Sequence, residues 1–200
     1  IVLRKTGMEI GPRPELKPWR EFLAHMQNAK DTVRIGLVGK YVELQDAYKS
    51  INEALFQAAT YNNRKLDLQY IHSEKLTESN VEEKLSSMDG LIIAPGFGQR
   101  GVEGKFVALK YAREHDMPTF GICLGMQCMV IEYARDVLGY KDANSTEMDV
   151  NTPHNVIDLM ESQKCISNMG GTMRLGEYDC ILQEGSKAEQ AYGKTHIKER

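Results

Sequence analysis

The chain has 200 residues, of which 42% are hydrophobic, and its 28 acidic side chains slightly outnumber 25 basic ones, for a net charge of −3. This balance does not favour a nucleic-acid or anionic-membrane partner, and no apolar stretch approaches the roughly 20 residues of a membrane-spanning helix. There is no secretory signal, and the four cysteines include no C-x-x-C pair, so the sequence predicts a cytoplasmic protein with free thiols and no metal site.

Residues 1–29 differ from the rest of the chain. The stretch TGMEIGPRPELKPW is rich in proline, glycine and charge, and WREFLAHMQNA has the apolar spacing of a short helix. We interpret this part as a linker followed by a helix. Because the chain begins with Ile1 and ends at Arg200 without a capping element, the sequence favours a portion of a longer polypeptide.

From residue 31 onward, apolar runs typical of buried strands alternate with helical patterns. The predicted strands are TVRIGLVG, LDLQYIH, GLIIAPG and PTFGI, and VEGKFVALKYAREH is a helix between the last two. Capping boxes that begin at Ser50 and Ser79 predict the starts of two further helices. This alternation predicts an α/β fold with a doubly wound, mostly parallel sheet.

After Gly139 the pattern loosens. We expect NTPHNVIDLM to begin a helix, with Thr152 as its N-cap and Pro153 in the first position. We expect MRLGEYDCIL and the residues after it to form short strands and turns.

Cys123 stands between two glycines, where a short apolar run with Phe120 and Ile122 gives way to a helical pattern from Met126 onward. The motif G-I-C-L-G predicts a sharp strand-to-helix turn, since glycine allows the close approach and unusual dihedral angles that such a turn needs. A thiol at the first turn of a helix lies at the positive end of the helix dipole, which favours the thiolate. We therefore predict that Cys123 is a nucleophile and that Cys128 belongs to the core.

The loop Gly96-Phe97-Gly98-Gln99-Arg100-Gly101 matches the pattern G-x-G-x-x-G between a strand and a helix. Dinucleotide binding is disfavoured, because the loop follows the third strand and because the next strand leads to Cys123 instead of to an acidic residue. Two alternatives remain. The loop is either a tight turn, or a segment whose backbone N–H groups point toward an anion formed beside the Cys123 sulfur.

A cysteine nucleophile usually needs a base, and the chain contains five histidines. His72 ends the second predicted strand, so we expect it at the same carboxyl edge of the sheet as Cys123, although nothing else favours it, while His115 has the position of a solvated helix cap. Sequence position singles out none of the five as the partner of Cys123.

Together these motifs resemble the class I glutamine amidotransferases, and more closely the glutaminase domain of the CTP synthase family. The stretches that carry the resemblance lie within residues 35–176 and are VGKYVELQDAYKSINEAL, APGFGQRGVEGK, GICLGMQ, TPHNVIDLM and NMGGTMRLG. The resemblance implies a flavodoxin-like three-layer fold for residues 30–200, lacking its C-terminal part. It also implies the end of a synthetase domain and an interdomain linker in residues 1–29.

The resemblance assigns roles to individual residues. Cys123 would attack the side-chain amide of glutamine, form a glutamyl thioester and release ammonia. The backbone N–H groups of Gly96 and Leu124 would form the oxyanion hole, because Pro95, where many relatives have glycine, has no N–H. Three residues would hold the substrate glutamine: Phe97, Gln127 and Glu147.

The family's catalytic histidine and glutamate lie in a His-Pro-Glu motif that does not occur here. The 200 residues alone are therefore not expected to hydrolyse glutamine with steady turnover. The resemblance implies GTP as an activator, contacted by Phe97 and Arg100. It also implies no cofactor in this domain, with ATP, UTP and Mg²⁺ in the synthetase domain, and a homotetrameric full-length enzyme. Two alternatives stay open: another class I amidotransferase or related cysteine hydrolase, which VGKYVELQDAYKS disfavours, and a non-catalytic regulatory module.

Overall fold

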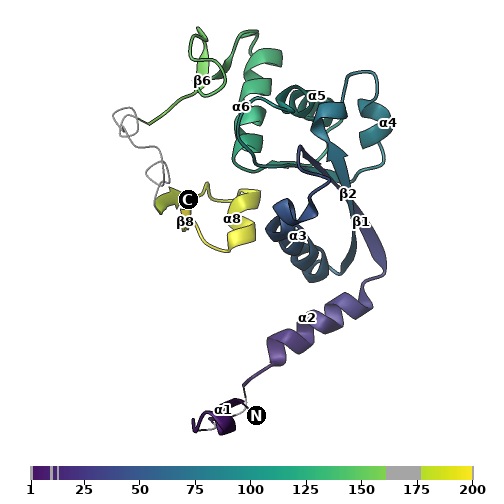
Figure 1. Ribbon diagram of the computed structural model, residues 1–200, viewed down its shortest axis with the longest axis vertical. Helices are drawn as coiled ribbons and strands as arrows, with labels where there is room; N and C mark the ends of the chain where they lie inside the picture. The colour runs from purple at the N-terminus through teal and green to yellow at the C-terminus, as the bar shows by residue number, and fades with distance from the viewer. Residues whose placement is uncertain (1, 10, 13, 161–176, 200) are drawn as a thin grey trace. The chain divides into compact units, whose positions relative to one another are not determined.

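The computed structural model describes residues 2–9, 11, 12, 14–160 and 177–199 (Figure 1). They divide into two compact units, Ile1–Ile157 and Asp158–Arg200, which are described separately. Cys165 and the motif NMGGTMRLG lie outside the described residues.

A four-stranded parallel sheet forms the centre of the first unit. Its strands are β1 (Asp31–Gly39), β2 (Arg64–His72), β3 (Gly90–Ile93) and β4 (Thr119–Gly121), in the order β2-β1-β3-β4. The four strands predicted from the apolar runs are thereby confirmed. The order 2-1-3-4 is that of flavodoxin-like folds, in which ligands bind outside the carboxyl ends of the strands near the point where the strand order reverses. Here that point lies between β1 and β3.

Helices connect the strands and precede the sheet. The crossover helices are α3 (Lys49–Tyr61), α4 (Val81–Leu85) and α5 (Val102–Glu114), and α6 (Leu124–Asp136) follows the last strand of the sheet. The helices α1 (Val2–Lys5) and α2 (Lys17–Asn28) precede β1. Two short 3₁₀ turns follow strands: η1 (Gln45–Tyr48) comes after β1, and η2 (Ser73–Lys75) comes after β2. The helix predicted from WREFLAHMQNA is therefore confirmed as α2.

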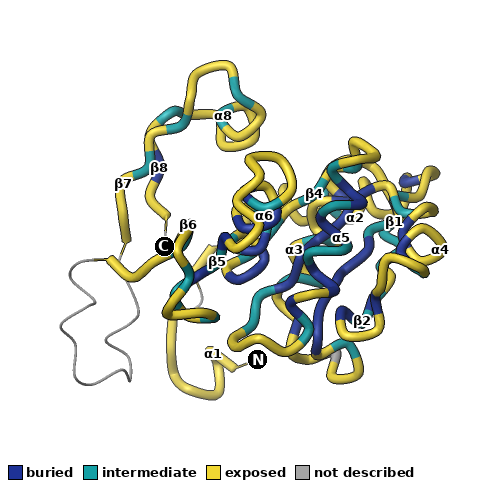
Figure 2. The backbone as a smooth tube through the Cα atoms, turned by 90° about the horizontal axis from the view of Figure 1, so that it is seen from above, coloured by how far each residue is buried: buried dark blue, intermediate teal, exposed yellow. Residues whose placement is uncertain are grey.

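The sheet carries a hydrophobic core on each face, because neighbouring side chains of a strand point to opposite sides. Val38 packs into one cluster with residues of α4, α5 and α6. Leu37 packs into the other with Ile51 and Leu55 of α3. Figure 2 shows the buried residues concentrated in the sheet and in the helix faces beside it. The doubly wound three-layer arrangement is thus confirmed.

Both predicted capping boxes are wrong. The helix α3 begins at Lys49 with Tyr48 as its N-cap residue, because the turn η1 runs directly into it, so Ser50 falls inside the first turn. The helix α4 has Asn80, not Ser79, at the N-cap position. The Asn80 side chain instead accepts a hydrogen bond from the Thr77 N–H, at 2.9 Å.

The helix predicted from NTPHNVIDLM is also wrong. Residues Asn155–Ile157 form the strand β6, which pairs in parallel with β5 (Asn144–Ser145). The Thr152 hydroxyl donates to the carbonyl of Asp142 at 2.7 Å instead of capping a helix. Pairing with β5 supplies the backbone partners that a helix would otherwise have provided.

The second unit contains an antiparallel pair of strands, β7 (Tyr178–Ile181) and β8 (His196–Glu199). This confirms short strands within its described residues. Between them lies α8 (Lys187–Tyr192), a helix that the sequence pattern did not predict. Its N-cap, Ser186, accepts a hydrogen bond from the Glu189 N–H at 3.1 Å.

One strand departs from the expected burial. Phe120 on β4 is 64% exposed, although its apolar run predicted a buried strand. In the four-stranded sheet β4 is one of the two edge strands, with β3 as its neighbour on one side only. In the part of the chain that the structure describes, no helix combines the length and apolarity needed to cross a membrane.

Candidate active site

The turn at Cys123 has the geometry of a nucleophile elbow. The strand β4 ends at Gly121 and α6 begins at Leu124, so only two residues join them. Cys123 is the N-cap residue of α6, with φ 54° and ψ −113°, and it is exposed. A residue other than glycine is strained at positive φ, and residues with such strain are often found at functional sites. The predicted strand-to-helix turn is confirmed.

Both flanking glycines are required by close backbone approach. A Cβ atom at Gly121 would lie 2.6 Å from the Gly125 carbonyl carbon and from the Met126 nitrogen. A Cβ atom at Gly125 would lie 2.0 Å from the carbonyl oxygen of Ile93. The start of α6 therefore packs directly on the end of β3, which holds the thiol above the carboxyl edge of the sheet.

The predicted oxyanion loop follows the neighbouring strand. Ile93 on β3 pairs with Gly121 on β4, and the Ile122 N–H donates to the Ile93 carbonyl at 3.0 Å, so the loop at Gly96 and the elbow leave adjacent strand ends. Among the described residues, the N–H groups of Gly96 and Leu124 have no backbone acceptor. Two backbone donors are therefore available for an anion beside the elbow.

Two lysines bind the carbonyl groups of this loop. Lys40, which follows β1, is 6% exposed, and its Nζ donates to the carbonyl of Phe97. Lys105 on α5 is fully buried, and its Nζ donates to the carbonyl of Ala94 at 2.7 Å. Unpaired buried charges are costly, so these contacts are what makes the two positions tolerable for lysine.

Sequence reasoning missed both lysines, although signals for them existed. Lys105 lies three residues after Val102 and four before Leu109, on the face of α5 that packs into the core. A lysine on an apolar stripe is unusual. Lys40 directly follows a buried strand, at the edge where sites form in this fold.

Phe97 and Arg100 are exposed and follow β3 at the carboxyl edge of the sheet. Phe97 is 79% exposed. Arg100 pairs with Glu74, and its guanidinium lies 5.4 Å from the centre of the Tyr41 ring. Lys40 Nζ lies at the same distance from that ring, so two cations lie close to Tyr41.

Gln127 and Glu147 present polar groups that have no partner among the described residues. The Oε1 atom of Gln127, in the first turn of α6, is buried and accepts no hydrogen bond from the described residues. Glu147 is exposed, and its carboxylate makes no ion pair within the described ranges. The Gln99 amide donates to the carbonyl of Met148, which joins the Gly96–Gly101 loop to the segment that carries Glu147.

The thiol of Cys128 differs from that of Cys123. Cys128 is fully buried in the core, as predicted, and its burial raises the pKa of the thiol to about 11. It therefore stays protonated at neutral pH, where only a thiolate is nucleophilic.

The described histidines of the first unit do not lie beside Cys123. His72 ends β2, three strand positions from β4, which corresponds to roughly 14 Å at the usual strand spacing. The other three bond within their own neighbourhoods: His25 with Asn63, His115 with Tyr111 and His154 with Asp142. His196 belongs to the second unit.

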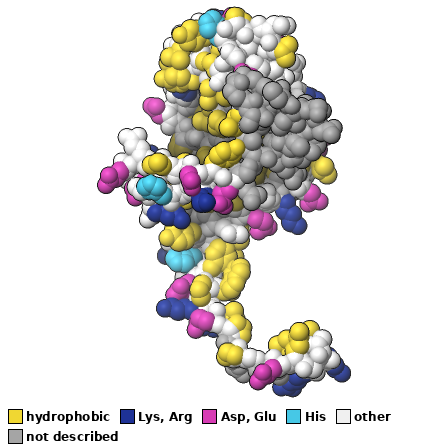
Figure 3. Space-filling view, turned by 90° about the vertical axis from the view of Figure 1, so that its left-hand side faces the viewer, with side chains coloured by type: hydrophobic (Ala, Val, Ile, Leu, Met, Phe, Trp, Pro, Cys, Tyr) yellow, Lys and Arg dark blue, Asp and Glu magenta, His cyan; other side chains and the backbone are white. Residues whose placement is uncertain are grey.

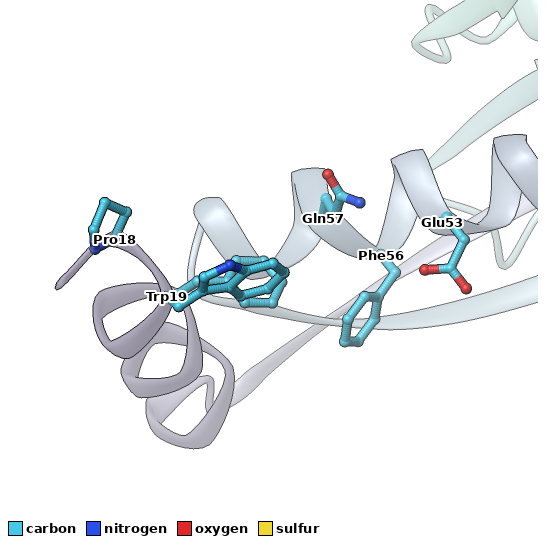
Figure 4. Close-up of a pocket in the computed structure, with 6 residues that line it drawn as sticks. Pro18, Trp19, Glu53, Phe56 and Gln57 are labelled. Atoms are coloured by element: carbon cyan, nitrogen blue, oxygen red, sulfur yellow. The ribbon is translucent and has the colours of Figure 1, made fainter. Parts of the chain in front are cut away.

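The surface of the first unit has two hollows. A groove of about 490 Å³ is lined by Trp19 and Phe22 of α2 and Phe56 of α3 (Figure 4), and hydrophobic side chains gather along α2 in the lower part of Figure 3. A second hollow of about 440 Å³ includes Gln99 and Met148. In the described ranges no cluster of three or more histidine, cysteine or acidic side chains is arranged to hold a metal ion.

Comparison with known proteins agrees with this geometry. Residues 43–199 match the family model described as "Glutamine amidotransferase class-I". The chain is 66% identical to a CTP synthase of Porphyromonas gingivalis and 63% identical to one of Bacteroides fragilis, in each case over 199 residues, all of this chain and 37% of the relative. It therefore spans little more than a third of the length of these curated relatives.

A solved structure is also similar. It is the glutaminase domain of CTP synthase from Trypanosoma brucei with bound acivicin, with a TM-score of 0.76 and 36% sequence identity, and the match covers 84% of this chain and 66% of that one. The chain thus belongs to the class I glutamine amidotransferases, as its elbow and sheet order indicate. Within that class it corresponds to the glutaminase domain of CTP synthases.

Proposed function

We propose that Cys123 hydrolyses the side-chain amide of glutamine and thereby supplies ammonia to a synthetase. The observation that carries this proposal is the strained, exposed position of Cys123 between two glycines that accept no side chain. A buried structural cysteine needs neither the strain nor the exposure.

The chemistry proceeds through a thioester. The Cys123 sulfur attacks the amide carbon, and the negative charge that develops on the amide oxygen is stabilised by the N–H groups of Gly96 and Leu124. The carbon–nitrogen bond then breaks once a proton reaches the nitrogen, which leaves as ammonia. Water attacks the thioester, releases glutamate and restores the thiol. No His-Pro-Glu motif occurs in the chain, so proton transfer rests on a group outside these 200 residues.

Three side chains bind the glutamine in this proposal. The unpartnered Oε1 of Gln127 accepts a hydrogen bond from the substrate, and the carboxylate of Glu147 pairs with its ammonium group. Phe97 covers the bound molecule with its exposed ring. Phe97 and Arg100 also contact GTP as the activator, and the cations around Tyr41 suit an anionic, aromatic ligand.

The parent reaction in this proposal is the ATP-dependent amination of UTP to CTP. ATP, UTP and Mg²⁺ bind the synthetase domain, and no cofactor belongs to this domain. Residues 1–29 contain the end of that synthetase domain and the linker, and residues 30–200 contain the amidotransferase domain. The full-length enzyme is a homotetramer in the cytoplasm, a location compatible with three free thiols among the described cysteines.

The test separates the two half-reactions in the full-length protein. Cys123→Ala should abolish CTP formation from glutamine and leave CTP formation from added ammonia, because free ammonia bypasses the thioester. The matched variant Cys180→Ala should keep both activities. Equal loss of both activities in folded Cys123→Ala protein would contradict the proposal.

Covalent labelling distinguishes an enzyme from a non-catalytic module. Acivicin, which is bound in the Trypanosoma brucei domain, should label the wild-type protein at Cys123 and leave Cys123→Ala unlabelled. If the wild-type protein stays unlabelled and hydrolyses no glutamine, the domain is a regulatory module instead.

A further inference from the structure

Lys105 is a buried cation that the proposed chemistry does not use. It lies on α5, its exposed fraction is 0%, and its Nζ donates to the Ala94 carbonyl at 2.7 Å. Lysine is almost never fully buried without a specific partner. Its burial lowers the pKa of the ammonium group, and the nearby Lys40 acts in the same direction.

The carbonyl that Lys105 holds belongs to the oxyanion loop. The Ala94 N–H donates to the Val38 carbonyl at 2.9 Å, which continues the sheet for one residue. The next residue, Pro95, has no N–H, so beyond Ala94 the loop leaves the sheet without a backbone donor. The Lys105 ammonium holds the Ala94–Pro95 peptide in place through its hydrogen bond to the Ala94 carbonyl.

A second lysine fixes the other side of the loop. Lys40 Nζ donates to the Phe97 carbonyl, one residue after Gly96. The carbonyl groups of Ala94 and Phe97 are thereby bound to ammonium groups, and the Pro95–Gly96 peptide, which carries the Gly96 N–H, lies between these two fixed points. Among the described residues the Gly96 N–H has no backbone acceptor, and it is available to the substrate.

Lys105 also interacts with the helix that carries the elbow. Three ionisable groups interact electrostatically with it: Lys40 after β1, Cys123 at the elbow and Cys128 on α6. The two thiols raise the pKa of Lys105 while burial lowers it. Lys105 therefore lies near the elbow as well as near the loop.

We propose that Lys105 is a positioning residue for glutamine hydrolysis: it holds the Ala94 carbonyl and thereby fixes the loop in which the Gly96 N–H faces the developing oxyanion. This inference rests on the proposed function and assigns Lys105 a role in it. The alternative is a purely structural lysine that satisfies a buried carbonyl and nothing more.

The experiment uses the full-length protein with three substitutions. Lys105→Met removes both the donor and the charge, and Lys105→Gln removes the charge but keeps an N–H donor. Lys110→Met is the matched control, because Lys110 lies on the same helix with a partly exposed side chain that pairs with Glu78. The measurements are kcat and KM with glutamine, CTP formation from ammonia, and the rate of Cys123 alkylation by iodoacetamide.

For Lys105→Met we expect the glutamine-dependent kcat to fall about 10- to 100-fold, less than the 10²–10³-fold loss seen when an oxyanion donor itself is removed. KM for glutamine and the ammonia-dependent rate should change little. Alkylation of Cys123 at pH 7 should match the wild-type rate, because alkylation does not use the oxyanion hole. Lys105→Gln should retain more of kcat than Lys105→Met, and Lys110→Met should match the wild type.

Each other result overturns the inference. An unchanged kcat in Lys105→Met would make Lys105 structural. A slower alkylation of Cys123 would mean that the substitution disturbs the elbow itself and not the oxyanion loop. If both Lys105 variants also lose the ammonia-dependent reaction, Lys105 is a folding residue and not a positioning one. Failure of the proposed function looks different, because the wild-type protein itself would then show no Cys123-dependent glutamine hydrolysis.

Discussion

Gly125 at the start of α6 lies against the carbonyl of Ile93 at the end of β3, so closely that a Cβ atom on Gly125 would be 2.0 Å from that oxygen. The contact joins the helix that carries the nucleophile to the strand that precedes the oxyanion loop. Any side chain at this position must push the two elements apart, and the distance between the Cys123 sulfur and the Gly96 N–H must change with them.

Gly125→Ala should therefore impair glutamine hydrolysis and stability together. Overpacking of this kind costs about 1–3 kcal/mol, and we expect a lower thermal unfolding midpoint with a large fall in kcat for glutamine. Gly11→Ala is the control, since a Cβ atom there meets nothing within 4 Å. A Gly125→Ala protein with wild-type kcat and stability would show that the elbow does not depend on this contact.

Cys123 should be the first of the four thiols to be alkylated at pH 7, because it is exposed at a helix start. Cys128 should be the slowest described thiol up to about pH 10, since burial raises its pKa to about 11. Time-resolved alkylation read by peptide mass checks both statements. If Cys128, Cys165 or Cys180 reacts before Cys123, the interpretation of the elbow is wrong.

Glu147→Gln should raise KM for glutamine roughly ten- to hundredfold, because a charge-assisted hydrogen bond is worth about 1.5–3 kcal/mol. The ammonia-dependent activity of the full-length protein should persist. Glu82→Gln is the matched control, because Glu82 is an exposed glutamate on α4. An unchanged KM would mean that Glu147 is an ordinary loop charge.

Residues 1–200 as an isolated polypeptide should show no steady glutamine turnover. No described histidine of the first unit lies beside Cys123, and His72 stands at the far edge of the sheet. Loss of general acid–base help costs typically 10²–10⁴-fold. Glutamate release by the isolated chain, with GTP added, should stay below detection beside that of the full-length protein. Comparable turnover that disappears in His72→Ala would establish His72 as the base after all.

The stability difference between Lys105→Met and the wild-type protein should depend on pH. Burial lowers the pKa of Lys105 below its ordinary value of 10.5. Just below pH 10.5 the unfolded wild-type chain therefore binds more protons than the folded one, and wild-type stability rises with pH. The unfolding midpoint of Lys105→Met minus that of the wild type should fall as the pH rises toward 10.5, while the same difference for Lys110→Met stays constant. A constant difference for Lys105→Met would contradict the inferred burial of a charge.

The sequence by itself predicted the class of fold and the position of the nucleophile. Apolar runs and helical spacing are local signals, and they located β1 to β4 and the start of α6. The elbow was equally legible, because G-I-C-L-G concentrates the backbone requirement of a tight turn in five consecutive residues. The capping box predicted at Ser50 failed because a side chain caps a helix only if the preceding backbone leaves the helical path, and η1, which runs into α3, does not.

Only the tertiary structure decided which distant residues meet. The predicted helix at Thr152 became the strand β6 because β5 offered it a partner, which local pattern does not reveal. The strand order placed His72 and Cys123 at opposite edges, although both follow strands at the same end of the sheet. It likewise brought Lys40, which follows β1, and Lys105 on α5 to the carbonyl groups of one loop, although the two lysines are 65 residues apart in sequence. Hydrogen bonds between such residues depend on the packing of whole elements, and that packing is not written in any single stretch of the chain.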